Sequence, residues 1–159
     1  MMVGDNKGNI GWTIMGPIPK RTATFGDIPT DWSTGELAWS GYLTPQDYPI
    51  VYNPKSDRLW TGNSRVVGGD MYAKLGNGGY ALGARSKQIK QGLFAKEQFD
   101  EASLLAIALD DKATFLSPWQ TFLLDNVLTD ENITANPSWQ GAKEILSQEK
   151  ALALSLIHI

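Results

Sequence analysis

The chain has 159 residues, which is enough for one domain with a hydrophobic core. Its net charge of −3 gives no broad cationic surface of the kind that nucleic-acid-binding proteins carry. The absence of cysteine excludes disulfides and thiol catalysis, and no apolar run approaches the roughly 20 residues that a membrane-spanning helix needs. We therefore expect neither nucleic acid nor a membrane among its partners.

The first half of the chain predicts short strands and loops. Residues 1–5 and 10–15 are strand candidates, and the Asn and Gly residues between them tolerate the positive φ that hairpin turns require. Residues 16–58 hold most of the prolines, which argue against a helix or a central strand. We predict a long loop there, packed on a larger body through its aromatic side chains. These are Trp32, Trp39, Tyr42, Tyr48 and Tyr52.

A third strand candidate, residues 59–62, precedes a second half that is predominantly helical. Residues 81–94 place apolar side chains on one stripe of a helix. Residues 101–109 predict another helix, because Asp100 is a suitable N-cap and an acidic residue follows it in the first turn.

Two further helices are expected. Asp110-Asp111 could cap a helix over residues 113–124, although Pro118 predicts a late start or a kink. The last helix, near residues 138–153, follows Asn136-Pro137, a usual entry signal. Strands and loops first and helices afterwards make α+β the predicted fold class.

The last six residues are interpreted as foreign to the protein. Residues 154–159 read back into a DNA string that resembles the transposon-end adapter used in sequencing libraries. An ordinary apolar helix end is the alternative. The six include His158, the only histidine in the chain. Without it, the natural segment has no histidine metal ligand, Ser-His-Asp triad or histidine acid–base group.

Six short motifs occur in an order and at a spacing that resemble the β-chain of the penicillin acylases. These N-terminal-nucleophile amidohydrolases include acyl-homoserine-lactone and cephalosporin acylases. The resemblance covers residues 1–128 and leaves 129–153 as an uncertain helical continuation. It departs from the family at Gly62, where relatives commonly carry alanine. The motifs are Asp5-x-x-Gly8-Asn9-Ile10-Gly11-Trp12, Gly16-x-Ile18-Pro19-x-Arg21, Trp39-x-Gly41-Tyr42, Tyr52-Asn53-Pro54, Leu59-Trp60-Thr61-Gly62-Asn63-Ser64-Arg65 and Gly83-Ala84-Arg85-x-x-x-Ile89.

In that family a precursor cleaves itself, and the serine exposed at the new β-chain N-terminus is the nucleophile, with its own α-amino group as the base. The resemblance implies a four-layer αββα fold and hydrolysis of linear amides, penicillin-like amides or acyl-homoserine lactones. It implies no cofactor, and it allows a structural calcium ion in the intact parent. The nucleophilic serine and the oxyanion asparagine are expected upstream of Met1. The chain is then an internal β-chain fragment that is inactive alone.

Arg21 is the active-site residue that the resemblance places within the chain, in a supporting role. It matches the arginine that lies beside the nucleophile and the oxyanion asparagine, where a guanidinium can fix carbonyl groups through several donors. Without the resemblance, a surface arginine next to Lys20 is the simpler interpretation. Asn63 is interpreted as structural, and Arg65 and Arg85 as partners of acids or loop carbonyls.

The implied partners are a small acyl-amide substrate and the α-chain and remaining β-chain of the same precursor. The implied enzyme is periplasmic or secreted, with its signal peptide upstream. The alternative from another class is a non-catalytic carbohydrate- or peptide-binding module that uses the Trp- and Tyr-rich loop. Burial of Trp39, Tyr42 and Tyr52 against the helices would contradict that module, whereas a flat exposed row of these rings would favour it.

Overall fold

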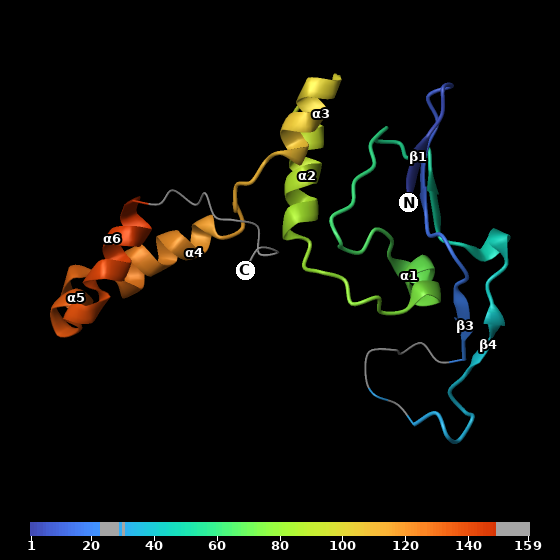
Figure 1. Cartoon of the computed structure of the whole chain (residues 1–159), viewed down its shortest axis with the longest axis horizontal. Helices are drawn as coiled ribbons and strands as arrows, with labels where there is room; N and C mark the ends of the chain where they lie inside the picture. The colour runs from blue at the N-terminus through green and yellow to red at the C-terminus, as the bar shows by residue number, and fades with distance from the viewer. Residues whose placement is uncertain (23–28, 30, 149–159) are drawn as a thin grey trace. The chain divides into compact units, whose positions relative to one another are not determined.

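The computed structural model describes residues 1–22, 29 and 31–148. It divides into two compact units, Met1–Ala95 and Lys96–Ile159 (Figure 1). The described part of the first unit holds five short strands followed by two α-helices, and that of the second unit is helical. This order confirms the predicted α+β class. Residues 149–159, which include the end of the last predicted helix and the suspected adapter-encoded tail, lie outside the described residues.

The first unit begins with a three-stranded antiparallel sheet. β1 (Met2–Gly4) pairs with β2 (Ile10–Thr13), and β2 pairs with β5 (Ile50–Tyr52), so β2 is the central strand. The predicted hairpin is confirmed, and Gly8 in its turn has a φ of 84°. Trp12 on β2 faces Val51 in the register and is buried. The buried side chain of this sheet is therefore carried by its central strand, β2.

Residues 16–58 are not the continuous loop that the prolines predicted. β3 (Pro19–Arg21) and β4 (Trp39–Tyr42) form a separate two-stranded antiparallel sheet, and the 3-10 turn η1 (Pro45–Asp47) leads toward β5. Proline is tolerated at the first position of a strand and on sheet edges, and β3 satisfies both conditions. The strand predicted over 59–62 was wrong, because no strand forms at those described residues.

Two helices complete the first unit. α2 (Ala84–Phe94) confirms the helix predicted from residue 81, with a later start. α1 (Gly69–Leu75) was not predicted, because it is short and glycines stand at both of its ends. The side chains of Trp60 and Phe94 meet edge to face at 5.8 Å, and the guanidinium of Arg58 lies 5.3 Å from the Phe94 ring centre. These contacts anchor the end of α2 to the preceding loop.

The start of α2 is anchored by a close backbone approach at Gly62. Nη2 of Arg85 donates to the Gly62 carbonyl at 3.3 Å and to Oδ1 of Asn63 at 2.8 Å. A Cβ added to Gly62 would lie 3.0 Å from the Ser86 nitrogen and 3.2 Å from its Cα. Glycine is therefore the residue that fits this contact.

We expect Gly62→Ala to destabilise the protein by about 1–3 kcal/mol, because the added methyl group overpacks the start of α2. Thermal unfolding of the active enzyme that carries this segment measures the change. Gly83→Ala is the matched control, since Gly83 has a negative φ and open space where a Cβ would stand. Equal melting temperatures for the two variants would contradict the steric argument.

The second unit begins with α3 (Glu101–Ala108), which confirms the helix predicted after Asp100. The Ser103 nitrogen donates to Oδ1 of Asp100 at 2.8 Å, and the Asp100 nitrogen donates to Oγ of Ser103 at 3.0 Å. This reciprocal pair is a capping box. The hydrogen bonds from Ser103 hold the pKa of the Asp100 carboxyl below its ordinary value.

The remaining helices of the second unit are short. α4 (Ser117–Phe122) starts late, with Pro118 in its first turn, so the predicted late start is confirmed, whereas the predicted cap at Asp110-Asp111 was wrong. α6 (Gln140–Gln148) confirms the last predicted helix, and the 3-10 turn η3 (Pro137–Trp139) leads into it. Across the described residues, no helix is long and apolar enough to cross a membrane. The π-turn η2 (Leu123–Val127) and α5 (Asp130–Ala135) were not predicted.

Candidate active-site segment

Arg21 ends β3, opposite Trp39 on β4, and its side chain is exposed. Its guanidinium packs on Gly76, the residue that ends α1. A Cβ on Gly76 would lie 3.4 Å from Nε of Arg21 and 3.5 Å from its Cζ. Gly76 has a φ of 70°, a conformation that suits glycine. The guanidinium of Arg21 therefore packs against the backbone at the end of α1.

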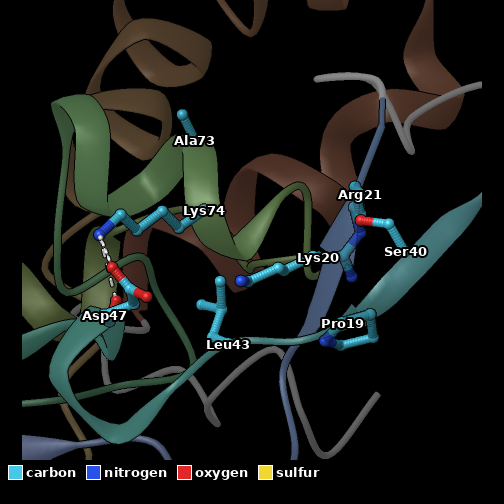
Figure 2. A pocket seen from close by; sticks show the side chains of 8 residues that line it. All are labelled: Pro19, Lys20, Arg21, Ser40, Leu43, Asp47, Ala73 and Lys74. Atoms are coloured by element: carbon cyan, nitrogen blue, oxygen red, sulfur yellow. Dashed lines mark hydrogen bonds and ion pairs between the residues drawn. The ribbon is translucent and has the colours of Figure 1, made fainter.

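An open depression of about 520 Å³ lies beside Arg21 on the first unit (Figure 2). It is formed by β3, by β4 and the turn after it, and by α1. Three of its lining residues are cations and one is an acid, so its field favours an anion or a carbonyl oxygen. The lining residues are Pro19, Lys20, Arg21, Ser40, Leu43, Asp47, Ala73 and Lys74.

Asp47 and Lys74 form an ion pair at one side of the depression, drawn with dashed lines in Figure 2. Nζ of Lys74 lies 3.5 Å from Oδ1 of Asp47, and Oγ1 of Thr44 donates to Oδ2 of Asp47 at 2.8 Å. The Thr44 hydrogen bond, followed by the charges of Lys74 and Lys20, lowers the pKa of Asp47. Both partners are partly exposed, so the pair adds little stability.

Arg21 differs from Lys74 in its contacts. Within the described part of the chain, its guanidinium has neither a hydrogen-bond acceptor nor an ion-pair partner. The guanidinium carries five N–H donors in a fixed plane. These donors are accessible to a ligand or to another part of the protein.

A side-chain network joins the first hairpin to the end of β5. Oδ1 of Asp5 accepts hydrogen bonds from the nitrogens of Lys7 and Asn9, each at 2.9 Å, and Oδ2 accepts one from Nδ2 of Asn9 at 2.7 Å. Asn53 continues the network: its Nδ2 donates to Oδ1 of Asn9 at 2.8 Å, and its Oδ1 accepts from the Ile10 nitrogen at 2.9 Å. Two of the sequence motifs thus meet in space. Sequence reasoning missed this link.

The hydrogen bonds from Asn9 are the main reason why the pKa of Asp5 lies below its ordinary value. The stability that the ionised carboxylate contributes is present above the pKa of an unfolded aspartate and is lost as the pH falls through the lower folded value. We expect the amide resonances of Lys7 and Asn9 to titrate together, with a midpoint below about pH 3.9. NMR of the active enzyme that carries this segment measures this, and Asp5→Asn should abolish the response. A midpoint at the ordinary value would contradict the network.

The loop aromatics are mostly exposed among the described residues, so their packing on a larger body stays a prediction. Trp39, Tyr42 and Tyr52 are exposed by 57%, 58% and 64%. They form no single row, since two lie on β4 and the third lies on β5 in the other sheet. Tyr48 does pack as predicted: it is half-buried, and its hydroxyl donates to the Gly16 carbonyl at 2.8 Å. Trp32 and Trp39 meet edge to face at 6.4 Å.

The other motif residues have structural contacts. Asn63 is in the left-handed region, with a φ of 57°, and its carbonyl oxygen accepts from the Ala81 nitrogen at 2.9 Å. Arg85 binds a loop carbonyl, as predicted. Arg65 instead lies over the Tyr72 ring, 4.7 Å from its centre. Among the described residues, no three potential metal-ligating side chains come together.

Comparisons with known proteins agree with the motif series. The sequence model of the penicillin amidase family matches residues 1–155, which is nearly the whole chain. The penicillin acylase 2 proenzyme of Pseudomonas sp. (strain SE83) is 31% identical over 70 residues. That stretch is 44% of this chain and 9% of the relative, so the comparison reaches only a small part of the relative's length. On the extent of the family match, the chain belongs to the penicillin amidase family.

Proposed function

We propose that the chain is a segment of the β-chain of a penicillin-acylase-type amidohydrolase, which cleaves the amide bond between an acyl group and an amine. The family match over residues 1–155 carries this proposal. The nucleophile is an N-terminal serine supplied by another part of the precursor, with its α-amino group as base. It forms an acyl-serine intermediate and releases the amine, and water then releases the acid. The enzyme acts in the periplasm or outside the cell, and the segment alone is inactive.

The parent adopts the four-layer αββα fold of N-terminal-nucleophile hydrolases. The two small sheets support this proposal, because large apolar side chains on them, such as Trp39, Tyr42 and Tyr52, are more than half exposed among the described residues. The α-chain and the remaining β-chain cover these rings in the parent. The same exposure favours the alternative of a carbohydrate- or peptide-binding module. We prefer the enzyme, because the rings lie in two different sheets and the family match runs through all of them.

Arg21 supports the reaction without forming a bond to the substrate. Its side chain lines an open depression, its guanidinium packs on Gly76, and it has no hydrogen-bond or ion-pair partner among the described residues. A planar guanidinium can hold two oxygens in one plane. It can therefore align the side chain of the oxyanion asparagine and so direct its amide donor at the negative charge that develops on the carbonyl oxygen.

A chimaera tests the proposed function. The stretch of the Pseudomonas penicillin acylase 2 proenzyme that matches this chain is replaced by the corresponding 70 residues. The expected chimaera cleaves itself into two chains and hydrolyses a chromogenic acyl anilide. The control reinserts the relative's own stretch through the same junctions. A chimaera that folds and cleaves itself but cannot acylate its serine would contradict the proposal.

A further inference from the structure

Asn77-Gly78 is the single Asn-Gly pair in the sequence, and it lies in an exposed loop after α1. The backbone nitrogen that follows an asparagine can attack the side-chain carbonyl carbon and close a five-membered ring. Glycine is the least hindered residue for this attack because it has no Cβ and tolerates many backbone conformations. The pair therefore combines the residue types and the exposure that this reaction needs.

The loop geometry holds the Asn77 side chain over the backbone that follows it. The Gly79 nitrogen donates to Oδ1 of Asn77 at 3.0 Å. This Asx-type hydrogen bond polarises the side-chain carbonyl and so makes its carbon more electrophilic. The space beside position 78 is small, since a Cβ there would lie 3.1 Å from the Tyr80 ring.

Other asparagines of the first unit are restrained by long-range partners. Asn63 precedes a serine, the next smallest follower of a described asparagine, but Arg85 holds its Oδ1 at 2.8 Å. Asn9 is bound by Asp5 and by Asn53. Asn77 differs from these two, because the hydrogen bond to its side chain comes from Gly79 in the same loop.

We propose that Asn77 deamidates spontaneously and thereby adds a negative charge beside Arg21. The Gly78 nitrogen gives its proton to the solvent and bonds to Cγ of Asn77. The bond from Cγ to the side-chain nitrogen breaks, and that nitrogen takes up a proton from the solvent and leaves as ammonia. Water then opens the succinimide ring at either carbonyl, which yields aspartate or isoaspartate. Water is the one co-reactant, and nothing is oxidised or reduced.

The change occurs next to the glycine on which Arg21 packs. A neutral amide becomes a carboxylate, and isoaspartate also lengthens the backbone by one carbon. Both products alter the loop that supports the guanidinium, and the charge lowers the net positive field of the depression. This inference does not depend on the proposed amidase function.

The experiment incubates the folded parent protein that carries this chain in mildly alkaline buffer made with heavy-oxygen water. Peptide mapping with an isoaspartyl methyltransferase assay locates the product, and NMR follows the Nε–H resonance of Arg21. We expect Asn77 to lose its amide and gain heavy oxygen before any loss is detectable at Asn63. The Arg21 resonance should shift in step with that conversion. Asn77→Gln, which must close a larger ring, should keep its amide and its Arg21 resonance. Earlier conversion of another asparagine, or an Arg21 resonance that stays fixed while Asn77 converts, would overturn the proposal.

Discussion

In the active enzyme that carries this segment, Arg21→Lys is expected to lower turnover about a hundredfold, equivalent to about 3 kcal/mol of transition-state stabilisation. Lysine keeps the positive charge but loses the planar fork of donors. If that fork aligns the oxyanion donor, its loss affects the transition state more than the bound substrate. KM should therefore change little while kcat falls. Steady-state kinetics, with folding checked separately, measure both constants.

Lys20→Ala is the matched control for this prediction. Lys20 is adjacent in sequence, lines the same depression and is exposed. Its removal changes the local charge without touching the guanidinium that rests on Gly76. We expect it to be nearly silent. Full turnover in Arg21→Lys with a loss in Lys20→Ala would show that the wrong cation was chosen, and two silent variants would assign Arg21 to the scaffold.

Local chemistry explains which parts of the fold could be predicted from the sequence. The Asn- and Gly-rich turn before β2 and the N-cap Asp100 of α3 each depend on residues a few positions apart, and both were predicted correctly in position, whereas the reciprocal hydrogen bond with Ser103 was not predicted. Short-range hydrogen bonds fix such features, so the sequence shows them directly. The late start of α4 follows in the same way from the fixed φ of Pro118.

The features that were missed depend on residues far apart in the sequence. The pairing of Arg21 with Trp39 makes a strand of a proline-bounded segment, and no local pattern signals that partner. The bonds that join Asn53 to Ile10 and Asn9 span more than forty residues. The contact of Gly76 with Arg21 likewise needs α1, a helix too short to show a period. The motif series drew attention to several of these residues, but it could not show which of them touch.

Few of the large apolar side chains are buried and many are exposed, and this difference bears on the stability of the isolated segment. Among the described residues, the buried hydrophobic side chains are those of Trp12, Ile18, Val67 and Leu128. Large apolar side chains such as Leu82, exposed by 82%, lie on the surface instead. A domain of this length normally buries about two-thirds of the surface that its unfolded chain exposes. The buried set is small compared with the conformational entropy that folding must overcome.

Residues 1–153 alone are therefore expected to lack a sharp, cooperative thermal transition and to bind a hydrophobic dye before heating. Differential scanning calorimetry and near-ultraviolet circular dichroism on the isolated segment measure this directly. The control is the self-cleaved chimaera, which carries the 70 matched residues of this chain and in which neighbouring chains cover the exposed apolar side chains, so that one cooperative transition is expected. A single sharp transition of the isolated segment, with equal calorimetric and van't Hoff enthalpies, would contradict the prediction. It would mean that the isolated segment buries enough apolar surface to fold without the rest of the precursor.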